Sequence, residues 1–310
     1  MNGRTVYDLA MAAGACSTLF AATDQGLFRS SDRGANWANV FLPTMPAETP
    51  TLAFEDMPVS PDAALMPAVA VCAGNPQVAY ATSWGGGVYR SDNGGSSWQS
   101  ATNGLGDRYL YDLAVHPSDC NTVYAATNGT GVFKTTNGGA SWQARSSGLG
   151  NLATRVLTLA PGPGQRLYVG TTGGVFRSDN AGGSWAASAS LPGGTVWALS
   201  VAPNQADTVY AGLESGGVYK STNAGASWQP TNTNLGFSKV RTLLVDPLDA
   251  QIVYAGNDLG RGIYRSGNGG AAWSEFNQGL GNRTVKMIGQ DGGACHALHA
   301  GTANGAWINR

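Results

Sequence analysis

Short runs of alternating hydrophobic and polar residues, separated by turn-forming residues, follow one another along the chain. The clearest set reads YDLAV at 111–115, TVYAA at 122–126, VFKT at 132–135 and SWQAR at 141–145. A period of two is typical of β-strands, and no window combines a 3.6-residue apolar period with helix-forming residues. Four short strands in about 44 residues predict one blade of a β-propeller.

An eight-residue motif lies between the third and fourth strands in most of these four-strand sets. It runs Ser/Thr, any residue, Asp/Asn, any, Gly, any, any, Trp. The six copies are SSDRGANW (30–37), SDNGGSSW (91–98), TTNGGASW (135–142), SDNAGGSW (178–185), STNAGASW (221–228) and SGNGGAAW (266–273). A second marker, an aromatic residue shortly after a glycine, recurs seven times, at Phe28, Tyr89, Phe133, Phe176, Tyr219, Tyr264 and Trp307. We therefore expect seven blades, the last of which stops before its motif.

The predicted fold is all-β, a seven-bladed β-propeller that forms a single domain over residues 1–310. The expected blades span approximately 5–40, 67–106, 109–151, 154–192, 195–236, 239–281 and 284–310. Residues 40–66 are an insertion, because Trp37 and Trp98 are 61 residues apart whereas the other neighbouring motifs are 43 to 45 apart. The seventh blade is expected to have three strands, with Met1–Thr5 adding a partial edge.

The motif has a local structural explanation. Its Asp or Asn side chain accepts backbone N–H groups inside the turn between strands three and four. Its glycine takes the positive φ that a tight turn needs, and its tryptophan packs against neighbouring strands. Five of the six copies carry a neutral Asn at the third position, which hard cations do not favour. We expect the motif to be structural and the protein to bind no metal there.

The six motifs resemble the Asp-box, or BNR repeat. Families with this repeat include sialidases, two-propeller xyloglucanases, sortilin-type receptors and photosystem II assembly factors. The resemblance covers almost the whole chain and implies a β-propeller, but it implies no single activity. The chain lacks the Arg-Ile-Pro element of sialidases, and it contains one propeller where the xyloglucanases place their cleft between two.

Composition narrows the classes of function. The chain has 18 Lys+Arg against 19 Asp+Glu, a net charge of -1, and only 12% charged residues. It therefore offers no basic stripe for nucleic acid. With 42% hydrophobic residues it is not of the disordered class, and it has no run of 18 apolar residues for a membrane span. Few lysines and many small polar residues fit an extracellular or cell-surface protein.

The four cysteines all fall between strands one and two of their blades. Cys16 and Cys295 flank the seam between the first and last blades, and Cys72 and Cys120 lie in neighbouring blades. We hypothesise the disulfides Cys16–Cys295 and Cys72–Cys120, and four free thiols are the alternative. The segment CHALH at 295–299 places only Cys295 and His299 on one face of a strand, so neither a metal site nor a cofactor is expected.

Binding is expected on the face that carries the turns between strands two and three and the connections between blades. There the start of strand one places a ring of residues around the central channel: Tyr7, Tyr111, Arg155, Trp197, Arg241 and Val285. Trp84, Arg108 and Arg261 are further candidates for ligand binding on this face. Inter-blade packing is the alternative role for the ring. The insertion, with five prolines and only acidic charges, is either a lid, a partner-binding loop or decoration.

Two functions remain. The first is a non-catalytic binding propeller, a monomer that takes a glycan, a peptide or a protein at the channel mouth. The alternative is a glycoside hydrolase, which requires two carboxylates about 5–9.5 Å apart. Asp24, Glu214 and Asp258 are the candidate catalytic residues for that alternative.

Overall fold

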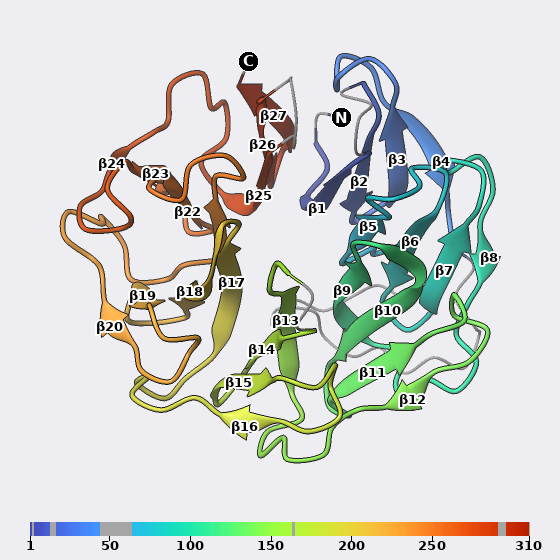
Figure 1. Ribbon diagram of the computed structural model, residues 1–310. Coiled ribbons are helices and arrows are strands. Elements are labelled where there is room, and N and C mark those ends of the chain that lie inside the picture. The colour runs from blue at the N-terminus through green and yellow to red at the C-terminus, as the bar shows by residue number, and fades with distance from the viewer. Residues whose placement is uncertain (2, 13–16, 44–63, 163–164, 291–295, 310) are drawn as a thin grey trace.

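The computed structural model describes residues 1, 3–12, 17–43, 64–162, 165–290 and 296–309. Seven antiparallel sheets stand around a central axis, with both termini at one seam (Figure 1). The predictions of an all-β seven-bladed propeller and of a three-stranded last blade are confirmed.

Within each blade the strands run in chain order, antiparallel, from the innermost to the outermost. Blade one holds β1 (Val6–Met11), β2 (Leu19–Thr23), β3 (Gly26–Ser30) and β4 (Ala38–Phe41), and blade two holds β5 (Val69–Val71), β6 (Ala79–Ser83), β7 (Gly87–Ser91) and β8 (Gln99–Ser100). Blade three holds β9 (Leu110–His116), β10 (Asp119–Thr127), β11 (Val132–Thr135) and β12 (Gln143–Ala144), and blade four holds β13 (Thr154–Leu159), β14 (Leu167–Thr171), β15 (Gly174–Ser178) and β16 (Ala186–Ala187). Blade five holds β17 (Val196–Ala202), β18 (Gln205–Leu213), β19 (Val218–Ser221) and β20 (Gln229–Pro230), and blade six holds β21 (Thr242–Val245), β22 (Val253–Asn257), β23 (Gly262–Ser266) and β24 (Ser274–Glu275). Blade seven holds β25 (Val285–Gln290), β26 (Leu298–Thr302) and β27 (Gly305–Asn309).

The core lies between neighbouring blades. In blades one to six the aromatic residue of the second strand is buried there, as Phe20 and Tyr80 illustrate. Gly95, in the motif of blade two, has φ +82°, and a Cβ at this position would lie 2.4 Å from the ring of Phe20 in blade one. Only glycine allows both this backbone conformation and this approach, so the motif fastens each blade to the one before it.

The repeat motif forms the same hydrogen-bond network in each blade that carries it. In blade five the Ser221 hydroxyl donates to Oδ1 of Asn223 (2.9 Å) and accepts from the N–H of Gly225 (2.8 Å). The N–H of Ser227 also donates to Oδ1 of Asn223, at 2.9 Å. The predicted role of the Asp/Asn side chain, as an acceptor for the turn backbone, is thereby confirmed.

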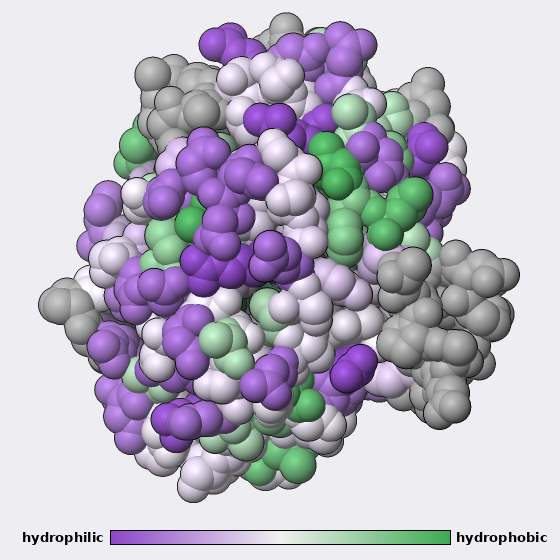
Figure 2. All heavy atoms as spheres, turned by 90° about the vertical axis from the view of Figure 1, so that its right-hand side faces the viewer, coloured by the Kyte–Doolittle hydropathy of each residue, from purple (hydrophilic) through white to green (hydrophobic). Residues whose placement is uncertain are grey.

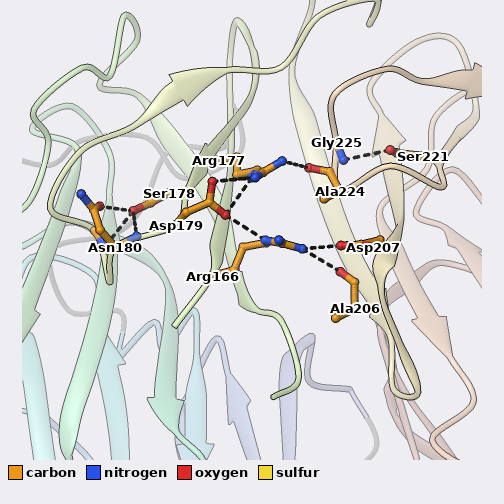
Figure 3. A network of polar contacts seen from close by, with 11 residues as sticks. Arg166, Arg177, Ser178, Asp179, Asn180, Ala206, Asp207, Ser221, Ala224 and Gly225 are labelled. Carbon is orange, nitrogen blue, oxygen red and sulfur yellow. Dashed lines mark hydrogen bonds and ion pairs between the residues drawn. The ribbon is translucent and has the colours of Figure 1, made fainter. Parts of the chain in front are cut away.

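Charged side chains tie blades together on the face that carries the motifs (Figure 3). Within blade four, the guanidinium of Arg177 donates several hydrogen bonds to the carboxylate of Asp179, the shortest at 2.6 Å. It also donates to the carbonyl of Ala224 in blade five at 2.9 Å. Arg166 reaches Asp179 at 2.9 Å and Asp207, in blade five, at 2.6 Å. These charge-assisted contacts link the surfaces of blades four and five.

The seam between blades seven and one closes without a shared strand among the described residues. Residues 1 and 3–5 form no strand, so the partial edge predicted for Met1–Thr5 is not formed by them. Instead, the N–H of Gly3 donates to Oδ1 of Asn304 in the β26–β27 turn at 2.7 Å. Met1, Met287 and Ala306 pack on the small core that surrounds Val6.

Candidate ligand-binding site

A cavity of about 250 Å³ opens on the central axis and is lined mainly by residues from the first strands of the blades. Of the ring predicted from the sequence, five residues line it: Tyr7, Tyr111, Arg155, Trp197 and Arg241. Val285 does not, because it is fully buried in the core between blades six and seven, and its neighbour Lys286 faces the cavity instead. A register shift of one residue moves a strand residue to the opposite face, and this explains the wrong assignment.

Aromatic and cationic side chains alternate along one wall of the cavity. The guanidinium of Arg155 lies 4.2 Å from the ring centre of Tyr111 and 5.7 Å from that of Trp197. The guanidinium of Arg241 lies 4.5 Å from the Trp197 ring. Each such contact contributes about 0.5–2 kcal/mol. The rings of Tyr111 and Trp197 also meet edge to face, with their centres 6.1 Å apart. The four side chains of Tyr111, Arg155, Trp197 and Arg241 therefore form one contiguous group along the wall, here called the row.

A second group of aromatic residues supports this wall from blades two and three. The ring of Trp84 contacts Tyr109 and Tyr111, with ring centres 5.2 and 5.0 Å apart. Trp84 is buried and forms a small cluster with Tyr7 and Leu65. It is therefore placed beneath the row rather than in the cavity.

Beside Trp197, the mouth carries a cluster of charged groups from blades five, six and seven. This group is here called the charge cluster and consists of Glu214, Lys239, Arg241, Asp258 and Lys286. Asp258 lies 3.3 Å from the ammonium of Lys286, 3.6 Å from that of Lys239 and 4.0 Å from Nε of Arg241. Lys239 also contacts Glu214 at 3.1 Å, and Glu214 accepts a hydrogen bond from the indole N–H of Trp197. The charge cluster is thereby joined to the aromatic row.

The other predicted residues lie outside the cavity. Arg108 and Arg261 are exposed on the same face of the propeller but do not line the cavity. Asp24 is in the β2–β3 turn, where burial raises the pKa of its carboxyl and the charge of Arg4 opposes this. The structure therefore brings Glu214 and Asp258 together and leaves Asp24 apart.

Two carboxylates that the sequence reading missed face the cavity. Asp8 and Asp112 line it, and burial raises their pKa values to about 8 and about 7. Both oxygens of each carboxylate accept backbone N–H groups. The available signal was the tetrapeptide Tyr-Asp-Leu-Ala, which occurs at 7–10 and again at 111–114.

Comparison with known proteins identifies the fold. No protein-family model and no curated protein matches the chain. A GH74 xyloglucanase from Xanthomonas campestris has a similar structure, with a TM-score of 0.78, 17% identity and coverage of 99% of this chain and 52% of that one. YCF48 from Cyanidioschyzon merolae has a TM-score of 0.70 and 14% identity, over 99% of this chain and 95% of its own. The extracellular domain of BT4673 from B. thetaiotaomicron has a TM-score of 0.72 and 16% identity, over 99% of this chain and 38% of that one.

The chain is a seven-bladed β-propeller, and six of its blades carry the motif that resembles the Asp-box. This propeller spans about half of the xyloglucanase chain, and identities of 14–17% establish the common fold only. YCF48 has also been seen bound to D1 peptide, in a structure with a TM-score of 0.66 and 14% identity, over 99% of this chain and 93% of that one.

The cysteines of this propeller give one observed disulfide. Cys72 and Cys120 are joined, with their Cα atoms 5.4 Å apart, and the bond links blades two and three. The proposed Cys16–Cys295 pair lies outside the described residues. Within the described part of the chain no group of three His, Cys, Asp or Glu residues is arranged to hold a metal. The same part contains no helix with the length and hydrophobicity to cross a membrane.

Proposed function

We propose that this propeller is a non-catalytic binding module that takes a glycan, a peptide or a protein segment at the mouth of its central channel. The observation that carries the proposal is the row of Tyr111, Arg155, Trp197 and Arg241 along the cavity wall. Planar aromatic and guanidinium groups stack on sugar rings and on peptide groups. The cavity volume of about 250 Å³ suits one residue of a polymer rather than several.

The glycoside hydrolase alternative has weaker support. Glu214 and Asp258 both contact the ammonium of Lys239, at 3.1 and 3.6 Å. The two oxygens that contact Lys239 are therefore no more than roughly 7 Å apart, which is compatible with the spacing that glycosidases need. Lys239, however, occupies the space between them in which a glycosidic bond would have to lie.

We further propose that the protein acts as a monomer outside the cell or at its surface. The side of the molecule shown in Figure 2 is mostly hydrophilic or neutral, and its hydrophobic residues form small separate groups. Stable interfaces between subunits commonly need a larger apolar patch.

The test is a glycan array and a random-peptide library, each probed with the wild-type protein and with Trp197→Ala. Binding that is lost in Trp197→Ala and kept in Trp37→Ala, a partly buried tryptophan in the motif of blade one, is the expected result. Hydrolysis of xyloglucan or a sialoside that disappears in Glu214→Gln or Asp258→Asn would contradict the proposal and support the enzyme.

A further inference from the structure

Asp258 is poorly satisfied for a carboxylate in its position. Its side chain is only 6% exposed, yet its nearest cations lie at 3.3, 3.6 and 4.0 Å. Its Oδ1 atom is buried without a hydrogen-bond partner. The ion pairs of Asp179 and Asp207 on the opposite face are 2.6 Å long although those carboxylates are more exposed. The hydrogen bond that it accepts comes from Lys286 at 3.3 Å, so Asp258 is held by the charge of the three cations rather than by close hydrogen bonds.

The turn that carries Asp258 would allow its side chain to move away from the three cations. The β22–β23 turn holds Asp258–Arg261, two residues more than the corresponding turn between β2 and β3. The next residue, Leu259, is 69% exposed, and the turn backbone is fixed by hydrogen bonds from Leu259 and Arg261 to Oδ1 of Asn257. The Asp258 side chain can therefore rotate outward while the turn keeps its shape.

The three cations around Asp258 come from two segments of the fold, in neighbouring blades. Lys239 and Arg241 precede β21, and Lys286 belongs to β25 of the next blade. Arg241 is stacked on Trp197, and Lys286 lies 6.0 Å from the ring centre of Tyr7. Positive groups fixed in this way form a ready subsite for an anion next to planar surfaces.

We infer that Lys239, Arg241 and Lys286 form the subsite for a carboxylate of the ligand, and that Asp258 is an internal counter-ion which the ligand displaces. The inference rests on the proposed binding function and specifies its ligand as a carboxylate-bearing residue with a planar or apolar body. The ligand carboxylate would take the place of Asp258, while its body lies along Trp197 and Arg155. Asp258 then sets the affinity by competing for the same cations.

The experiment uses benzoate and N-acetylphenylalanine as probes, with benzamide and N-acetylphenylalanine amide as matched neutral compounds. Binding is measured by calorimetry and by tryptophan fluorescence. We expect the acids to bind and the amides not to, Asp258→Asn to bind the acids on the order of tenfold more tightly, and Arg241→Gln or Lys286→Met to lose a similar factor. Arg265→Gln, in β23 beside the motif of blade six, is the matched control and should leave binding unchanged.

Further probes identify the kind of ligand that supplies the carboxylate, and other results would refute the inference. Peptides with a free or amidated C-terminus, and glucuronate against glucose, show whether a peptide or an acidic sugar supplies the carboxylate. The inference is overturned if acids and amides bind wild-type protein alike, or if Asp258→Asn binds the acids no more tightly. If Asp258→Asn does not fold, a structure of the wild type with benzoate decides, because Asp258 must have left the three cations. A neutral ligand that depends on Trp197 but not on Arg241 would leave the binding function intact and refute the carboxylate subsite.

Discussion

Asp8 and Asp112 hold the same place in two copies of one tetrapeptide, and each carboxylate accepts a backbone hydrogen bond from the next blade. Oδ1 of Asp8 accepts from its neighbour Leu9 at 2.8 Å, and Oδ2 accepts from Val69 of blade two at 2.9 Å. Asp112 accepts in the same way from Leu113 at 2.8 Å and from Leu157 of blade four at 2.7 Å. The two carboxylates therefore join innermost strands of successive blades where the cavity opens.

These two groups predict a pH dependence of stability. Burial raises the pKa of Asp8 to about 8 and that of Asp112 to about 7, and the charge of Asp112 contributes to the shift of Asp8. In the unfolded chain both titrate near pH 4. The native state therefore binds more protons than the unfolded state between about pH 4 and 8, and stability falls as pH rises through that window. Urea unfolding at pH 5 and pH 8 should show a lower midpoint at pH 8.

The double variant Asp8→Asn with Asp112→Asn tests whether these two carboxylates cause the decrease of stability with rising pH. An amide offers one acceptor oxygen, so each substitution leaves one backbone N–H without its bond and costs about 1–3 kcal/mol at pH 5. This deficit should shrink at pH 8, because the amide does not ionise. Asp92→Asn, at an exposed position, is the control. An equal deficit at both pH values would mean that neither carboxylate causes the dependence of stability on pH.

The disulfide between Cys72 and Cys120 predicts a loss of stability when it is removed. The bond closes a loop with a sequence separation of 48, and Cys72 is fully buried between blades two and three. Replacing both cysteines with alanine should lower the free energy of unfolding by about 2–4 kcal/mol in the loop-entropy model. Alkylation of the denatured, unreduced protein followed by mass spectrometry counts the free thiols. Modification of Cys16 and Cys295 alone, located by peptide mapping, would refute the proposed Cys16–Cys295 bond, whereas four unmodified cysteines would support both bonds.

The fold could be predicted because each repeat encodes its own turn. The hydroxyl, amide and glycine of the motif lie within a few residues of one another, so Ser221, Asn223 and Gly225 reveal their network in the sequence. The packing of Gly95 on Phe20 was not foreseen, because it joins residues 75 positions apart in different blades. Contacts of this kind depend on the angle between blades, which no single repeat specifies.

The site was predicted only where it follows the repeat. Tyr111, Arg155 and Trp197 occupy the same position of their blades and meet around the axis. Lys239 and Asp258 come from a connection and a turn that differ between blades, so alignment of the repeats gave no reason to pair them. Lys286 was missed because β25 was read one residue out of register.

The Asn of the motif provides the sharpest test of how the blades are held. Asn223→Ala removes the acceptor for the Ser221 hydroxyl and for the Ser227 N–H, and the partner of the Ser227 hydroxyl at 2.9 Å. Because water can reach most of these groups, their loss should cost about 0.5–1.5 kcal/mol in urea unfolding followed by tryptophan fluorescence. Asn223→Asp should remain close to the wild type, because Asp32 accepts the equivalent bonds in blade one. Thr222→Ala, at the exposed and variable second position, is the control, and a variant Asn223→Ala as stable as Thr222→Ala would show that the network does not stabilise the blade.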